Sequence, residues 1–295
     1  MSSRAKQRGA QAAPPADLPY RLPWRSVGVR AGAHRGKLEG SGGCFDGWAP
    51  RWQRPGPRRI DWRVSVRDPV EGLHVRRFGQ KSAISVYALV DVSASMGFEG
   101  RADKMQLAAD LCAALASSAR RAGDAFGMIG CGARVEKDLH FPASRARGSE
   151  TEMLRRLREH VPAARGSDGF VEAASLLAGK RKLVFLISDF HMAADACERI
   201  FSALSPHDIV PIILTDTLEV EELPRWGLLS LTDLEFGRRR LVVMRPSLRE
   251  AWQRRSEGRR AELNSVAARY GREPFEVRNR IDWDRLGGYL ISGGA

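Results

Sequence analysis

The amino-acid sequence predicts an α/β protein built on a doubly wound, mostly parallel sheet with flanking helices. Short apolar runs rich in β-branched residues alternate with segments of helical periodicity between residues 83 and 214. Each run is short and apolar throughout, as expected of strands buried on both faces of a sheet. Small oxygen-bearing side chains follow two of these runs, at the sheet edge where open α/β sheets bind their ligands.

The predicted elements divide the chain into four parts. Residues 1–20 are rich in Ala, Pro and Gln, and we expect a disordered tail. Residues 21–82 form an Arg-rich extension with one strand, Gly72–Phe78, and we expect this extension to pack on the core. The core comprises residues 83–235. Its predicted strands are Ile84–Val90, Ala125–Cys131, Val135–Phe141, Lys182–Ser188 and Asp208–Leu214, and its predicted helices are Asp103–Ala122, Glu150–Val161, Gly169–Leu177 and Ala193–Leu204.

The fourth part, residues 236–295, departs from this alternation. Two apolar runs around Gly237 predict a hairpin at the edge of the sheet, and a long basic helix follows, begun by Pro246 and stopped by Gly271. The elements predicted here are the strands Leu228–Phe236, Arg240–Arg245 and Glu273–Val277 and the helices Leu248–Tyr270 and Asp282–Ile291.

The composition narrows the classes of function. The 295 residues carry a net charge of +13, which favours acidic partners. Arginines gather in Arg51–Pro69 and Arg238–Arg260 without the aromatic, zinc-knuckle or helix-turn-helix patterns of nucleic-acid binding, so solvated basic faces are the preferred interpretation. No run approaches the roughly 18 apolar residues that span a bilayer. The four cysteines form no CxxC pair, and no secretory signal is recognisable, so we expect a cytoplasmic protein.

Hydroxyl and carboxylate side chains cluster after the predicted strands. Asp91, Ser93 and Ser95 form an Asp-x-Ser-x-Ser pattern after the first core strand. Asp189 follows a later strand, and Ser167 lies in a turn before a helix. Each residue alone is also typical of a helix cap or a turn. Together they form a set of hard oxygen ligands, which favours Mg²⁺ or Mn²⁺ over a thiolate-binding metal.

This pattern resembles the metal-ion-dependent adhesion site of the von Willebrand factor A domain, which combines a DxSxS loop, a Thr in a later loop and an Asp after a later strand. The resemblance places Asp91, Ser93, Ser95 and Asp189 at matching positions. Ser167 stands where the family has Thr, and Thr151 is a poorer substitute because it falls in or near an earlier helix. The resemblance implies a metal that accepts an acidic side chain from a binding partner.

A closer resemblance covers most of the chain. The bacterial family called domain of unknown function 58 is similar in the segments RRIDWRVSVRDPVEGLHVRRF (Arg58 to Phe78), DVSASM, LISDF, DIVPIILTD and LTDLEFG. These von Willebrand A-like proteins are often encoded beside MoxR-type AAA+ ATPases. The resemblance implies action with such an ATPase in the maturation, assembly or metal insertion of an acidic client protein. The short form also resembles the member from methanol-oxidation gene clusters, whose client would be methanol dehydrogenase. We expect Arg58, Arg59 and Met96 to contact the partner.

Two alternatives to a non-enzymatic binding module stay open. A basic nucleic-acid-binding protein rests on the charge alone. A metal-dependent phosphohydrolase would use Asp91 as its nucleophile, but it needs a second acid two residues on, where Ser93 stands. The sequence contains neither a GxxxxGK[ST] phosphate loop nor a GxSxG nucleophile elbow.

Overall fold

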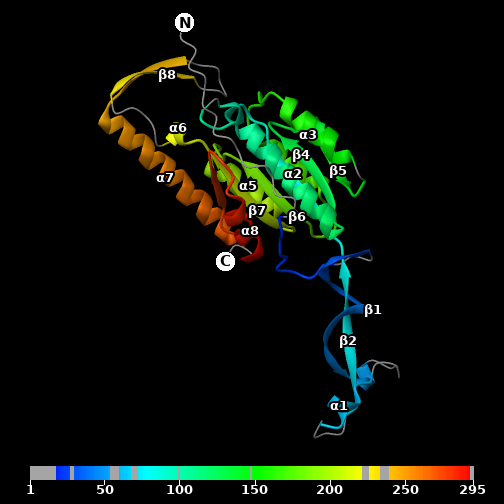
Figure 1. Cartoon of the computed structure of the whole chain (residues 1–295). Coiled ribbons are helices and arrows are strands. Elements are labelled where there is room, and N and C mark those ends of the chain that lie inside the picture. The colour runs from blue at the N-terminus through cyan, green and yellow to red at the C-terminus, as the bar shows by residue number, and fades with distance from the viewer. Residues whose placement is uncertain are drawn as a thin grey trace. The chain divides into compact units, whose positions relative to one another are not determined.

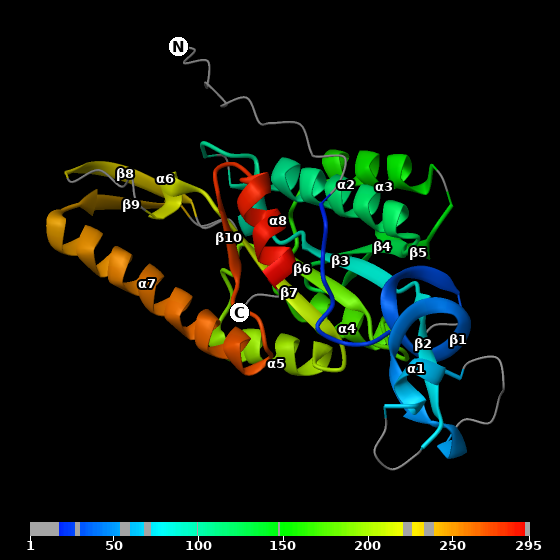
Figure 2. The same cartoon turned by 60° about the horizontal axis from the view of Figure 1, so that its bottom comes forward.

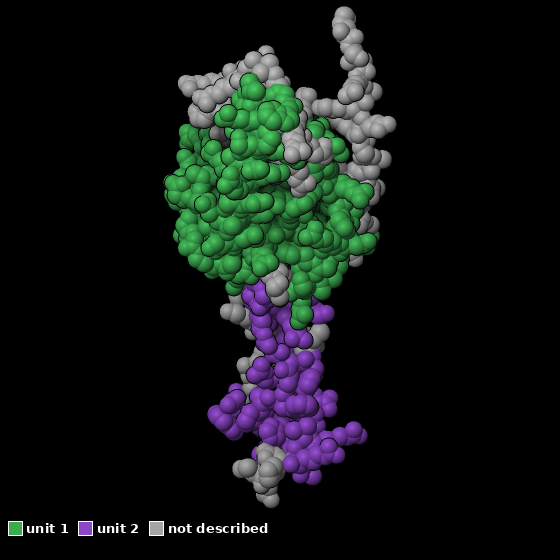
Figure 3. Space-filling model, turned by 90° about the vertical axis from the view of Figure 1, so that its left-hand side faces the viewer, with its two compact units in different colours: residues 1–21, 85–121, 125–295 green, residues 22–84, 122–124 purple. Residues whose placement is uncertain are grey.

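The structure is a computed structural model (Figure 1) that describes residues 18–26, 30–53, 60–67, 72–98, 100–146, 148–220, 226–232 and 239–292. The chain divides into two compact units, which Figure 3 colours separately. The first unit comprises residues 1–21, 85–121 and 125–295, and the second comprises residues 22–84 and 122–124. All five predicted metal ligands belong to the first unit.

A six-stranded sheet forms the centre of the first unit, in the strand order β10-β7-β6-β3-β4-β5. β5 runs antiparallel to β4, and the other neighbouring strands run parallel. From β3 the chain proceeds outward to β5 and then returns to β6 on the other side of β3, so β3 and β6 flank the topological switch point. The strands are β3 (Ser85–Asp91), β4 (Ala125–Cys131), β5 (Val135–Ser144), β6 (Leu183–Ser188), β7 (Asp208–Thr215) and β10 (Phe275–Arg278).

Helices cover both faces of this sheet (Figure 2). One face carries α4 (Asp168–Leu176), α5 (Ala194–Leu204) and α7 (Pro246–Arg269), which bury Phe170, Phe201 and Leu263 against Leu89 and Leu186 of the strands. The other face carries α2 (Lys104–Ala122), α3 (Ser149–Glu159) and α8 (Trp283–Ser292). Alternate residues of a strand point to opposite faces of the sheet. Since helices cover both faces, the strand residues on each face must be apolar. This architecture confirms the predicted doubly wound α/β class. None of the described helices has the length and apolar character needed to cross a membrane.

The predicted C-terminal hairpin forms, but it does not join the central sheet. β8 (Gly227–Thr232) and β9 (Arg239–Met244) pair antiparallel as a separate two-stranded sheet. β10 takes the edge position instead, through parallel pairing with β7. Since β10 belongs to the sheet and α7 to its core, the boundary predicted at residue 236 does not separate a core from an extension.

The first described residues also belong to the first unit. Leu18 is 1% exposed, and its backbone N–H donates to Ser118 Oγ of α2 at 2.7 Å. The backbone N–H of Arg21 donates to the carbonyl of Leu290 at 3.1 Å. The structured chain therefore begins within the tail that we predicted for residues 1–20, and the rest of that tail lies outside the described residues.

The second unit contains an antiparallel pair of strands, β1 (Ala31–Pro50) and β2 (His74–Ser82). Only β2 was predicted, at Gly72–Phe78. β1 was not predicted because its sequence is rich in glycine and does not alternate between apolar and polar residues with a period of two. Its pairing with β2 has repeated register shifts, which disturb such an alternation. The short helices η1 (Arg51–Gln53) and α1 (Trp62–Ser65) lie between the two strands. Asp61 caps α1 by accepting the backbone N–H groups of Arg63 and Val64. That this segment packs on the core stays a prediction.

Candidate metal centre

Four of the five predicted ligands meet at the carboxyl ends of β3 and β6. Asp91 is the last residue of β3, and Asp189 directly follows β6. Ser93 and Ser95 lie in the turn after β3, around the short 3₁₀ helix η3 (Ala94–Gly97). The backbone N–H of Ala94 donates to the carbonyl of Ala164 at 2.9 Å, which fixes this turn against the loop before α4. The cluster therefore lies at the switch point of the sheet.

Hydrogen bonds join these four side chains. Ser93 Oγ and Ser95 Oγ are 3.1 Å apart, and Ser95 Oγ donates to Asp189 Oδ1 at 3.2 Å. Asp91 Oδ1 accepts the backbone N–H of Ser93 at 2.8 Å, and Asp91 Oδ2 accepts the Ser188 hydroxyl at 2.5 Å. The structure thus brings Asp91, Ser93, Ser95 and Asp189 into one cluster; metal binding by it stays a prediction.

The two carboxylates of the cluster are buried but differ in their electrostatic surroundings. Asp91 is 2% exposed and forms no ion pair with any residue of the described ranges. Burial, with the nearby charge of Asp189, raises the pKa of Asp91 to about 6. Burial would raise the pKa of Asp189 as well, but His191 and Lys104 outweigh this effect and lower that pKa to about 2. Asp91 is therefore the carboxylate that lacks a compensating cation.

Lys104 is a member of the cluster that sequence analysis did not identify as a site residue. Its Nζ donates to Asp189 Oδ2 at 2.8 Å, to Glu219 Oε1 at 2.9 Å and to the carbonyl of Ser95 at 3.3 Å. Glu219 comes from the short helix α6 (Thr217–Val220). Burial lowers the pKa of Lys104, yet the two carboxylates outweigh burial and raise it. A lysine at the first residue of a helix interacts unfavourably with the helix dipole, and the position of Lys104 at the start of α2 is therefore unusual, although it does not indicate which residues pair with the lysine.

The oxygen atoms of the cluster fit a small hard cation in type and spacing. Adjacent ligands of an octahedral Mg²⁺ at about 2.1 Å lie about 3.0 Å from each other. The Ser93–Ser95 and Ser95–Asp189 separations, 3.1 and 3.2 Å, are close to that value. Asp91 adds a buried negative charge without a cation. Lys104 engages only Oδ2 of Asp189, whereas Oδ1 accepts the Ser95 hydroxyl and the backbone N–H of His191.

The remaining predicted site residues are placed differently. Ser167 is the N-cap residue of α4, and no hydrogen bond joins it to the cluster among the described residues. Thr151 is exposed in the first turn of α3. Met96 is 1% exposed because η3 turns its side chain inward, so the prediction that it contacts a partner is wrong for this conformation. Arg58 and Arg59 lie outside the described residues.

The fold and the cluster together define a class: a doubly wound α/β protein with an oxygen-rich, partly anionic cluster at the switch point of its sheet. The chain belongs to the family described as "Protein of unknown function DUF58", whose model matches residues 55–262. The family resemblance stated from the sequence motifs is thereby confirmed.

Two relatives match this chain over different extents. It is 28% identical over 265 residues to an uncharacterized protein of Mycobacterium tuberculosis, a match that covers 87% of this chain and 81% of the relative. An uncharacterized protein in the moxR 3' region of Paracoccus denitrificans is 35% identical over 98 residues, which are 33% of this chain and 93% of that protein.

Solved structures that match this chain have lower sequence identities than these relatives. BatB from Bacteroides thetaiotaomicron has a TM-score of 0.43 and 14% identity, with 70% of this chain and 96% of that chain covered. Proximal thread matrix protein 1 from the mussel byssus has a TM-score of 0.39 and 13% identity, with 70% of this chain and 46% of that chain covered. A likeness at this level carries no functional inference.

Proposed function

We propose that this protein is a non-enzymatic binding module that takes up an acidic side chain of a partner through Mg²⁺ or Mn²⁺. In this proposal it acts with a MoxR-type AAA+ ATPase in the maturation, assembly or metal insertion of a client protein, such as methanol dehydrogenase. The observation that carries the proposal is the arrangement of Ser93 Oγ, Ser95 Oγ and Asp189 Oδ1, separated by 3.1 and 3.2 Å at the switch point. The relative named for the moxR 3' region supports the choice of ATPase.

Each residue of the cluster has a distinct part in this proposal. Ser93, Ser95 and Asp189 would hold the ion, and Asp91 supplies negative charge while its Oδ1 fixes the backbone of Ser93. When bound, the ion supplies an electrophilic position that accepts a carboxylate. Lys104 holds Asp189 through Oδ2 and balances its charge, which makes the affinity for a free cation modest until a partner carboxylate contributes.

The side chains around Asp91 support binding rather than hydrolysis. A phosphohydrolase that uses Asp91 as nucleophile needs a group near it that exchanges a proton at neutral pH. Its hydrogen-bond donors include the hydroxyls of Ser188 and Ser93 and the backbone N–H of Ser93, and none of these can do so. The imidazole of His191 pairs with the other carboxylate, since its Nδ1 lies 3.8 Å from Asp189 Oδ2.

Metal titration tests the first half of the proposal. Calorimetry with Mn²⁺ should show binding to the wild type and none to Asp91→Ala, whose circular dichroism should stay native because only a strand end changes. Asp168→Ala is the matched control, since its carboxylate is 79% exposed at the start of α4. Equal Mn²⁺ binding by wild type and Asp91→Ala would refute the site.

Co-purification with a MoxR-type ATPase tests the second half. Binding should require Mg²⁺ and be lost with EDTA. Ser93→Ala and Asp189→Asn should each weaken it, and the double variant should lose little more, because both act through one ion. Losses that simply add would contradict a shared ion. Steady phosphate release from a phosphomonoester, abolished by Asp91→Asn, would favour the enzyme instead.

A further inference from the structure

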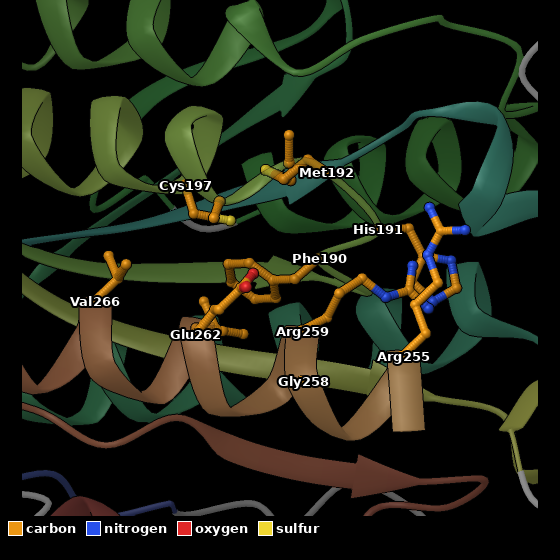
Figure 4. Close-up of a pocket in the computed structure, with 12 residues that line it drawn as sticks. Phe190, His191, Met192, Cys197, Arg255, Gly258, Arg259, Glu262 and Val266 are labelled. Carbon is orange, nitrogen blue, oxygen red and sulfur yellow. The ribbon is translucent and has the colours of Figure 1, made fainter. Parts of the chain in front are cut away.

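A second feature of the first unit has the properties of a binding site. A cavity of about 510 Å³ lies between the loop after β6, the start of α5 and the middle of α7 (Figure 4). Phe190, Cys197, Leu263 and Val266 line its mostly apolar side, which also carries Glu262, and each of these four apolar residues is at most 6% exposed. The volume is in the range of pockets that bind small ligands or single peptide side chains.

Positive charge gathers at one end of this cavity. Figure 4 shows the side chains of Arg255 and Arg259, from α7, beside His191. Neither arginine forms an ion pair or a hydrogen bond with another residue of the described ranges. By contrast, two other arginines of α7 are paired, Arg260 with Glu276 and Arg269 with Glu198. Two guanidinium groups without partners beside an apolar wall suit a ligand that carries both a carboxylate and an apolar side chain.

Gly258 supplies an independent observation. It lies in the interior of α7 and lines the cavity, and a Cβ built there would meet no atom of the described residues within 4 Å. Glycine in the interior of a helix is destabilising relative to alanine, and no close approach among the residues that the structure describes requires it. Its missing side chain leaves the backbone of α7 open to the cavity. A ligand that packs against this backbone would give a reason for glycine at this position.

We propose that this cavity binds a short acidic segment of a partner protein, with an apolar side chain against Phe190 and Leu263 and a carboxylate between Arg255 and Arg259. The contact goes beyond the metal-dependent function, because it uses none of Asp91, Ser93 and Ser95. A smaller cavity of about 50 Å³, lined by Asp189 and Glu219, shares Phe190, His191, Arg259 and Leu263 with it. Both contacts are therefore available to one partner.

Fluorescence anisotropy in the presence of EDTA tests this proposal without the metal. The probes are a fluorescein-labelled peptide of sequence Glu-Leu-Phe-Glu and its counterpart with both glutamates replaced by glutamine. Wild type should bind the acidic peptide at least tenfold more tightly than the glutamine peptide. The double variant Arg255→Glu/Arg259→Glu should lose at least tenfold. Arg254→Glu is the matched control on the same helix, exposed but outside the lining, and should change binding less than twofold.

Gly258 gives a test that leaves every charge in place. Gly258→Trp should fill the cavity and weaken the acidic peptide at least tenfold, whereas Gly258→Ala should raise the melting temperature of the protein. Asp91→Ala should bind the peptide like wild type, which separates this site from the metal centre. Unchanged binding in folded Gly258→Trp, equal losses in Arg254→Glu and the double variant, or equal affinity for the two peptides would overturn the proposal.

Discussion

Different interactions stabilise the interior of each of the two units. In the first unit, strand side chains such as Leu89 and Phe185 are fully buried between two layers of helices. In the second unit, the described apolar side chains that are buried are Ala49, Val75 and Ile84, while Trp62 is 64% exposed. Hydrogen bonds between charged side chains contribute more to the stability of the second unit. Asp46 accepts hydrogen bonds from Arg25 and Arg77, and Asp61 accepts one from Arg76.

This difference explains why the candidate site lies in the first unit. The oxygen ligands of a metal must be held within a few tenths of an ångström, and strand ends in a close-packed sheet can do this. Paired arginines at a surface hold positions less firmly because water and salt compete with each pair. We therefore expect substitutions to have their largest effects in the first unit.

Removal of a core side chain is the strongest test of the comparison. Phe185→Ala should lower the free energy of unfolding by about 3–5 kcal/mol, because it leaves a cavity in the centre of the sheet. Trp62→Ala, in the second unit, should change it by less than about 0.5 kcal/mol, since the indole is mostly exposed. Urea unfolding followed by circular dichroism measures both. Comparable losses would mean that the second unit depends on Trp62 as part of a core.

Removal of the buried ammonium group should have the next largest effect. Lys104→Met removes the ammonium group that pairs with Asp189 and Glu219, and it should lower the free energy of unfolding by about 3 kcal/mol. Mn²⁺ should recover part of this loss in the variant and raise its melting temperature more than that of wild type. Arg155→Met is the control, because its pairs with Glu152 and Glu159 are exposed and worth less than about 1 kcal/mol. A variant as stable as wild type without metal would show that Lys104 is dispensable.

The sequence was informative where local pattern and fold agree. The runs that became β4 and β6 are continuous and apolar, and the strand-end residues Asp91 and Asp189 followed from the rule that ligands bind at the carboxyl edge. Lys104 was missed because its partner Glu219 is 115 residues away, and no local pattern encodes that pairing. Met96 was misplaced for a related reason: the inward turn of η3 depends on tertiary packing.

Acid sensitivity offers a finer and smaller test within the second unit. Asp61 accepts hydrogen bonds from Arg76 Nε at 2.8 Å and from Trp48 Nε1 at 3.2 Å. The Arg76 bond, followed by the Trp48 bond, lowers the pKa of Asp61 from 3.8 to about 2. A lowered folded-state pKa means that this stabilisation is complete above about pH 4 and is lost as the pH falls toward 2.

The Trp48 indole N–H resonance in NMR spectra reports this titration directly. Its shift should move with a midpoint near pH 2, and Asp61→Asn should abolish the movement without changing the dispersed signals of the first unit. The control is Asp46→Asn, which removes the neighbouring carboxylate but leaves the Trp48–Asp61 hydrogen bond intact. A midpoint near the ordinary aspartate value of about 4 would mean that Arg76 does not hold Asp61 in solution. The second unit would then lack one of the charged contacts that stabilise it in place of a large apolar core.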